Sequence, residues 1–124
     1  MHRIELDVGG TRFATAQATL AGSDSFFSGL VGHAPEAPVL FVDRDPTHFR
    51  HVLNWLRGVR VLPRNTATLT ELRAEADFYC MLDMRDAIDV AIDAAAATWR
   101  TQTVEGLLTG LQREVAALAP AAWP

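Results

Sequence analysis

The segment that decides the fold is Ile4-Glu5-Leu6-Asp7-Val8-Gly9-Gly10-Thr11-Arg12-Phe13. Apolar residues alternate with acidic ones through its first half, which predicts a β-strand with one buried face. The two glycines then separate two strand-like runs, and this predicts a tight hairpin because glycine adopts positive φ angles without steric penalty. A phosphate-binding loop is the alternative for a glycine pair. We favour the hairpin, since the glycine spacing lacks the dinucleotide and P-loop patterns and no lysine follows.

A second informative segment is Val39-Leu40-Phe41-Val42-Asp43-Arg44-Asp45-Pro46. Its continuous apolar run predicts a short strand buried on both faces. Asp45 and Pro46 predict a helix start, because aspartate is a favoured N-cap and proline fits the first helical position. Gly58 is placed to end this helix. The apolar stripe of the helix consists of Phe49, Val52, Leu53 and Leu56.

Further helices are predicted on both sides of these segments. Residues 18–32 form short helical turns, residues 32–38 a loop, and residues 82–97 a longer helix. Thr68 and Glu71 have the spacing of a capping box for another helix, whose stripe is Leu69, Leu72, Ala76 and Tyr79. Cys80 is expected to be an inert core thiol between buried neighbours. The predicted core contains Leu6, Val8, Phe13, Val42, Phe49, Leu53, Leu56, Leu72, Phe78 and Tyr79.

The C-terminal segment has a different pattern. Its apolar residues recur at alternating spacings of four and three, the heptad pattern of a coiled coil. They are Val104, Leu108, Leu111, Val115 and Leu118. About two heptads are fewer than a coiled-coil prediction requires, and Gly106 and Gly110 each cost roughly 1 kcal/mol within a helix. We therefore favour a helix packed on its own domain, with a helix that extends an oligomer as the alternative.

The composition describes one ordinary globular domain. The chain has 124 residues, of which 49% are hydrophobic and 21% charged, and these values suit a single core. A net charge of −4 argues against nucleic-acid binding. No apolar run approaches the ~20 residues of a membrane helix, and acidic residues near the start leave no signal-peptide region. One cysteine forms no internal disulfide, so we expect a reducing, cytoplasmic setting.

The segment at residues 4–13 is similar to the opening of BTB/POZ domains of the potassium-channel tetramerisation, or KCTD-like, family. Residues 41–46, then Phe49 and residues 53–57, resemble the second family signature, and residues 75–79 resemble the third. The residues that carry these motifs include Gly9, Gly10, Phe13, Pro46, Phe49 and Tyr79. The resemblance implies an α+β fold with a small, mainly antiparallel sheet flanked by helices. We predict a BTB/POZ domain at residues 1–95 and a C-terminal helical extension at 96–124.

The resemblance implies a protein-interaction domain and not an enzyme. Domains of this family assemble side by side as tetramers, pentamers or other states, through polar contacts from segments that match Arg12, Asp43, Arg44 and Asp45. The implied partners are other copies of the chain and, for a KCTD-like adaptor, a cullin ubiquitin ligase. The alternative is an assembly or regulatory module for a potassium channel or other membrane complex. No cofactor is implied, and the zinc site of many channel domains needs more cysteines than Cys80.

Two alternatives stay open for the polar residues of the second segment. In the first, Asp45 only caps the helix, while Asp43 and Arg44 are solvated. In the second, His48 and His51 join the two aspartates in the metal site of a metal-dependent enzyme. We favour a solvated helix face for the histidines, because no serine or cysteine lies in a nucleophile motif.

Overall fold

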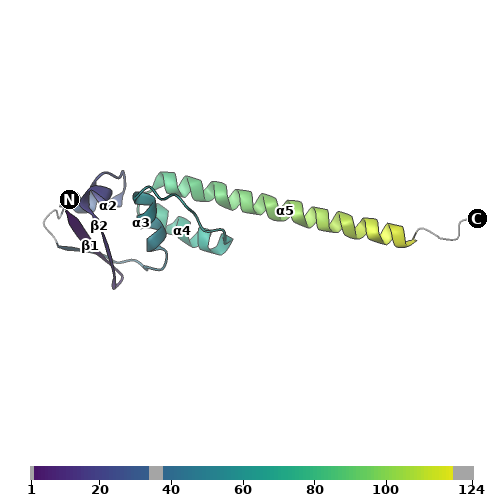
Figure 1. Cartoon of the computed structure of the whole chain (residues 1–124), viewed down its shortest axis with the longest axis horizontal. Coiled ribbons are helices and arrows are strands. Elements are labelled where there is room, and N and C mark those ends of the chain that lie inside the picture. Colours follow the sequence, from purple (N-terminus) through teal and green to yellow (C-terminus); the bar gives the residue numbers. More distant parts are fainter. Residues whose placement is uncertain (1, 34–37, 119–124) are drawn as a thin grey trace, which may run out of the picture. The chain divides into compact units, whose positions relative to one another are not determined.

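The computed structural model describes residues 2–33 and 38–118 (Figure 1). The chain divides into two compact units, Met1–Ile92 and Asp93–Pro124. In order, the elements are β1 (Arg3–Val8), β2 (Thr11–Ala16), α1 (Gln17–Ala21), α2 (Phe26–His33), β3 (Val39–Val42), α3 (Phe49–Leu56), α4 (Thr66–Phe78) and α5 (Leu82–Leu118). The predicted α+β class is confirmed. The functional division after residue 95 stays a prediction.

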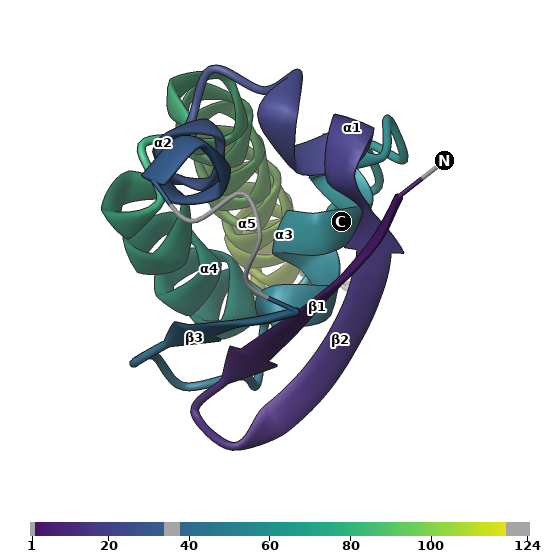
Figure 2. The same ribbon diagram turned by 90° about the vertical axis from the view of Figure 1, so that its left-hand side faces the viewer.

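The three strands form one sheet in the order β2-β1-β3, with helices covering one of its faces (Figure 2). β1 pairs antiparallel with β2 and parallel with β3. The sheet is therefore mixed, and the expected antiparallel arrangement holds for one of its two pairings. The alternation predicted for β1 is confirmed, because Ile4, Leu6 and Val8 are buried under the helices.

The predicted hairpin is confirmed at Gly9 and Gly10, whose φ angles are +56° and +98°. Gly9 also makes a close approach to the chain that leaves β3. Its amide donates a hydrogen bond to the Val42 carbonyl at 2.9 Å. A Cβ atom at position 9 would lie only 2.4 Å from the Arg44 carbonyl oxygen. The hairpin tip thus packs on residues 42–44 through a residue that must lack a side chain.

The segment around β3 departs from the sequence prediction at two points. Phe41 is 63% exposed, because the helices cover only one face of this edge strand, and its predicted burial is wrong. The following helix, α3, begins at Phe49 and not at Pro46. Asp45 Oδ1 accepts a hydrogen bond from the Thr47 amide at 2.8 Å. Asp45 therefore stabilises a turn that precedes the helix, and its predicted role as the helix cap is wrong.

α3 and α4 end in the same backbone motif. After α3, Gly58 has a φ angle of +88°, and the Val59 amide donates to the Asn54 carbonyl at 2.9 Å. After α4, Cys80 takes the place of the glycine with a φ angle of +56°, and the Met81 amide donates to the Ala76 carbonyl at 2.9 Å. A residue with a side chain rarely adopts this conformation. Cys80 is exposed there, so the predicted core thiol is wrong.

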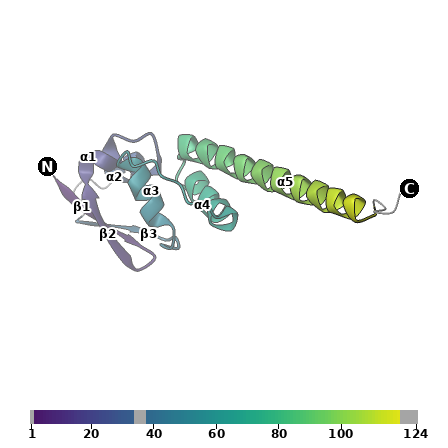
Figure 3. The same ribbon diagram turned by 45° about the vertical axis from the view of Figure 1, so that its right-hand side comes forward.

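α4 lies beside the first turns of α5 (Figure 3), and Arg73 on α4 pairs with Asp89 on α5. The cap of α4 is Asn65, whose side chain accepts a hydrogen bond from the Thr68 amide at 3.1 Å. The predicted capping box of Thr68 and Glu71 is therefore wrong. The predicted apolar stripe is confirmed, since its four residues are buried: Leu69, Leu72, Ala76 and Tyr79.

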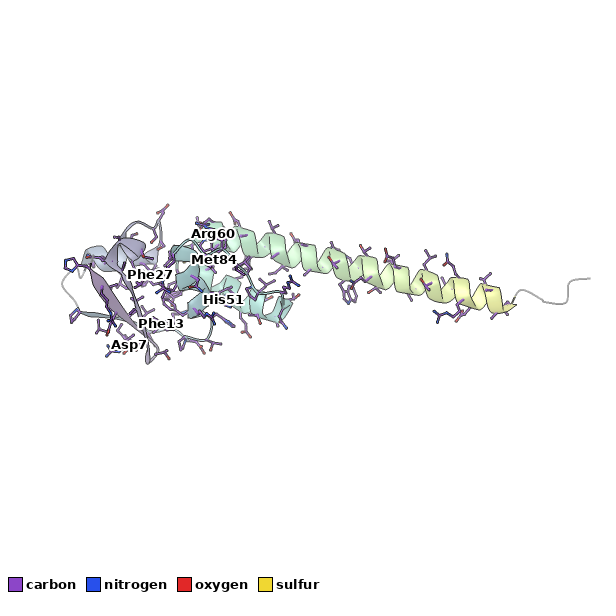
Figure 4. The ribbon with its side chains drawn as sticks, viewed as in Figure 1. Asp7, Phe13, Phe27, His51, Arg60 and Met84 are labelled. Atoms are coloured by element: carbon purple, nitrogen blue, oxygen red, sulfur yellow. The ribbon has the colours of Figure 1, made fainter. Side chains whose placement is uncertain are left out.

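Aromatic rings form the centre of the core. The Tyr79 ring lies 4.7 Å from the Phe27 ring and 5.7 Å from the Phe49 ring, measured between centroids. In Figure 4, Phe13 and Phe27 lie where the sheet meets the helices, and Met84 lies among the helices at the start of α5. The predicted core residues are buried with three exceptions. Phe13 and Leu56 are partly buried, and Phe78 is 42% exposed, so the predicted burial of Phe78 is wrong.

The second unit is helical through all of its described residues, because α5 continues to Leu118. The helix predicted at residues 82–97 is therefore longer than expected. The heptad side chains have exposed fractions between 53% and 80%. Packing of this helix on its own domain stays a prediction.

Candidate functional site

The outer face of the sheet, opposite the helices, carries the candidate interaction surface. Strand register places Asp7 of β1 between Arg12 of β2 and Phe41 of β3, in one row across the sheet. Asp7 projects away from the helices in Figure 4. Asp43 and Asp45 are exposed just beyond the end of β3. The structure therefore brings Arg12, Asp43 and Asp45, three of the predicted contact residues, to one end of the sheet.

The charges on this face form weak ion pairs within the chain. One guanidinium nitrogen of Arg12 lies 3.0 Å from the Glu5 carboxylate, and Arg3 lies 3.2 Å from the other oxygen of that carboxylate. Exposed pairs of this kind contribute only about 0–1 kcal/mol to stability. Their geometry can rearrange at small cost, so Arg12 and Glu5 remain free to meet charges on another protein.

Arg44 is bound within the chain. Its Nε and Nη2 atoms each lie 3.0 Å from Oε2 of Glu75 on α4. Its guanidinium also lies 4.3 Å from the centroid of the Phe78 ring, a cation–π contact. The side chains of Arg44 and Glu75 are 30% and 13% exposed. The local alternative of a solvated Arg44 is therefore wrong, because this arginine joins the end of β3 to α4.

Glu75 and Phe78 complete this contact within the chain, and sequence reasoning did not predict it. Both lie in the segment at 75–79 that resembles the third family signature, but nothing in the sequence links that segment to Arg44. The separation of Arg44 and Glu75 along the chain is 31 residues, so no helical or strand periodicity relates them. Only the packing of α4 against the end of β3 brings them together.

The two histidines do not form a metal site with the aspartates. His48 Nε2 lies 2.5 Å from the Glu71 carboxylate, and this contact joins the start of α3 to α4. Asp45 is hydrogen-bonded to Thr47. In the described ranges, 2–33 and 38–118, no three His, Cys, Asp or Glu side chains lie close enough to hold a metal ion. The geometry therefore gives the metal-dependent alternative no ligand set.

His51 predicts a pH dependence of stability. Burial, reinforced by the charges of His48 and Arg50, lowers the pKa of His51 below its ordinary value of 6.5. The unfolded chain therefore binds the proton first, and the free energy of unfolding should fall as the pH drops below that ordinary pKa. We expect urea titrations at about pH 7.5 and about pH 5.5 to show this loss, and His51→Gln to reduce it. His33→Gln, at an exposed position, should leave the loss unchanged; an equal effect of both variants would contradict the assignment.

A hollow of about 890 Å³ lies beside the corner that precedes α5, with Trp55 and Asp83 in its wall. Asp83 accepts hydrogen bonds from Trp55 Nε1 at 3.1 Å and from Arg60 Nη1 at 2.9 Å. Burial alone would raise the pKa of Asp83, but these hydrogen bonds and one from the Met84 amide outweigh burial and lower it. Arg60 and Asp83, two of the charged residues in the wall of the hollow, are therefore paired with each other.

The comparison with protein families decides the identity of this fold. The BTB/POZ domain family matches residues 4–87, which include the hairpin, β3 and its loop, α3 and α4. The chain belongs to the BTB/POZ family. It is of the potassium-channel tetramerisation type, as the sequence motifs predicted. The matched range contains Glu5, Asp7, Arg12, Phe41, Asp43 and Asp45 of the outer face, and Arg3 lies just before it.

Curated relatives place this BTB domain among KCTD-like proteins. It is 42% identical over 82 residues to BTB/POZ domain-containing protein KCTD3 of Homo sapiens, covering 61% of this chain and 10% of that protein. It is 43% identical over 82 residues to SH3KBP1-binding protein 1 of Mus musculus, covering 61% and 12%. It is 36% identical over 93 residues to FH protein interacting protein FIP2 of Arabidopsis thaliana, covering 68% and 31%. The chain thus spans between about a tenth and a third of these relatives.

BTB domains of this type are protein-interaction and oligomerisation domains, and this coarse function holds for the chain. The family is a protein-interaction family and not an enzymatic one. None of the helices in the described residues is both long and apolar enough to cross a membrane.

Proposed function

We propose that this BTB domain is the self-assembly module of a protein-binding adaptor. The subunit contact is the end of the sheet that carries Arg12, Phe41, Asp43 and Asp45. The observation that carries the proposal is Phe41, a large aromatic side chain that is 63% exposed on a face with charged neighbours. Aromatic residues are enriched in protein interfaces, where they fill pockets on the partner and contribute much of the binding energy.

Charge on both sides of Phe41 suits a contact between identical copies. Arg12 is positive, whereas Asp43 and Asp45 are negative and lie beyond the end of β3. In a head-to-tail contact one copy's basic side chain faces a different patch on its neighbour, and a closed ring follows when the rotation between copies closes. Arg44 supports this surface from behind through its contact with Glu75, because it fixes the course of the loop that carries the two aspartates.

Native mass spectrometry of the full chain tests this proposal. The unmodified chain is expected to assemble at micromolar concentration. Phe41→Glu and Asp43→Arg should each shift it towards monomer, because a new or reversed charge in a desolvated contact costs roughly 2–5 kcal/mol. Both positions are exposed in the single chain, so circular dichroism should remain unchanged.

The matched control is Val61→Glu, which introduces the same charge at an apolar residue that is 72% exposed and lies outside the surface. It should leave assembly intact. Full assembly of both Phe41→Glu and Asp43→Arg would place the contact elsewhere on the domain. A monomeric unmodified chain would contradict self-assembly itself.

For the adaptor role, the resemblance to KCTD-like proteins supports a cullin ubiquitin ligase as the second partner. Two of the matched relatives are named for the proteins that they bind, which supports a role as a link between proteins. Binding of a purified cullin N-terminal region to the assembled chain would support this partner. Absence of binding to the assembled chain would remove the cullin and leave self-assembly standing.

A further inference from the structure

The apolar seam of α5 is longer in the structure than the heptad residues alone indicate. Within the second unit, the same spacing of three and four continues backwards from Val104 through Thr101, Ala97 and Ala94, and all of these positions are helical. The a positions are then Ala94, Thr101, Leu108 and Val115, and the d positions are Ala97, Val104, Leu111 and Leu118. This seam covers more than three heptads, the length that a coiled coil requires.

The two glycines fall outside the seam. In this register Gly106 takes an f position and Gly110 a c position, on the side of the helix that faces away from a coiled-coil partner. The two glycines still destabilise the helix, but they leave no gap in the face that packs against a partner. The packed face of a coiled coil therefore stays intact.

The single polar residue of the seam is already satisfied within its own helix. Thr101 Oγ1 donates a hydrogen bond to the Ala97 carbonyl at 3.0 Å. Its hydroxyl therefore needs no partner from another chain, and its methyl group is available for packing. Burial of this seam would leave no hydrogen-bonding group of these side chains unpaired, which removes the main cost of covering it.

Charges beside the seam point to a second copy of the same helix as the occupant. Arg100 takes a g position and Glu105 the e position of the next heptad. In a parallel coiled coil with aligned registers, a g residue faces the e residue of the following heptad on the partner helix. Arg100 of one copy would then face Glu105 of the other, and both side chains are exposed in the single chain. An antiparallel pair with the same overlap would set the two Glu105 side chains against each other, because e positions then face e positions.

We propose that residues 94–118 form a parallel coiled coil with the same segment of another copy of this chain. This second contact between copies is separate from the one proposed for the sheet. Because BTB domains of this type oligomerise, assembly raises the local concentration of the segment, and a seam of marginal strength then suffices. The coiled coil in turn strengthens the whole assembly, since two linked contacts bind more tightly than either alone.

Disulfide trapping tests both the contact and its direction. In a background with Cys80→Ser, which removes the natural thiol, Leu111→Cys places a cysteine at a d position. Equivalent d positions in a parallel coiled coil lie close enough for a disulfide between copies. Mild oxidation of the full chain should therefore convert most of it into a covalent dimer. Thr109→Cys in the same background places the thiol at a b position, on the outer side of the coiled coil. This variant should give little covalent dimer.

A charge exchange provides the second test. Arg100→Glu should weaken the assembly, because it sets two carboxylates face to face, and Arg100→Glu combined with Glu105→Arg should restore it. Failure of Leu111→Cys to cross-link beyond Thr109→Cys, in a chain that native mass spectrometry shows to be assembled, would overturn the coiled coil and leave the sheet contact standing. If Phe41→Glu weakens the assembly while Leu111→Cys in the same chain still forms the disulfide, the coiled coil forms independently of the sheet contact.

Discussion

Replacement of Phe49 by alanine is expected to lower the free energy of unfolding by roughly 3–5 kcal/mol, as for other large aromatic residues in close-packed cores. Phe49 is 1% exposed and contacts rings from three different elements. Its centroid lies 4.7 Å from that of Phe13 and 5.9 Å from that of Phe27. Truncation leaves a cavity between the sheet, α2 and α4 that rigid neighbouring rings cannot fill. A domain of this size has a total stability of only about 5–15 kcal/mol, so the loss is severe.

Urea titration followed by tryptophan fluorescence measures this loss. Tyr79→Phe is the matched control in the same cluster, because it keeps the ring and removes only the hydroxyl. That hydroxyl is buried and has no hydrogen-bond partner among the described residues. Its removal should therefore be neutral or slightly stabilising. A loss below about 0.5 kcal/mol for Phe49→Ala, the range of surface substitutions, would show that α3 is placed wrongly.

Reversal of the charge at Arg44 has the second large expected effect. Arg44→Glu removes the contacts with Glu75 and Phe78 and places a second carboxylate beside Glu75, whose side chain is 13% exposed. A buried ion pair costs about 3–5 kcal/mol when one partner is removed, and an exposed pair about 0–1 kcal/mol. This pair lies between those limits, so we expect a loss of about 2–4 kcal/mol.

The exchange Arg44→Glu with Glu75→Arg restores the pairing of opposite charges and should recover part of the lost stability. Asp43→Arg, at the exposed neighbouring position, should leave the stability within about 0.5 kcal/mol of the unmodified chain. A stable Arg44→Glu chain would mean that the contact with Glu75 does not hold β3 to α4. Because this variant changes folding as well as charge, the variants at Phe41 and Asp43 are the proper tests of assembly.

Local regularities in the sequence predicted most of the fold. The alternation of apolar and acidic residues predicted β1 and its buried face, and the glycine pair predicted the hairpin. Both signals depend only on residues that are neighbours in the sequence. The apolar stripe predicted α3 and most of the residues that it buries. The first turn of that helix was wrong because two local motifs competed: Asp45 can cap either a helix or a turn, and its hydrogen bond to Thr47 selects the turn.

The errors arose where long-range packing decides. Whether Phe41 is buried depends on which faces of β3 the helices cover. The sequence of β3 alone does not predict this, because it does not specify where the strand lies in the sheet. Phe78 appeared apolar enough for the core, but it supports Arg44 at the surface. For the candidate site, the family resemblance proposed Arg12, Asp43 and Asp45 as contact residues, and this role stays a prediction. Phe41 was not proposed, because the sequence pattern assigned it to the core.

The turn between α4 and α5 has a practical consequence. Its left-handed residue is Cys80, which is exposed and is the only thiol in the chain. A maleimide dye can therefore be attached to each copy at one known position without any substitution. Stepwise photobleaching of single labelled particles would then count the copies directly, at nanomolar concentrations where ensemble methods lose signal. The same dye would report exchange of copies between particles through energy transfer.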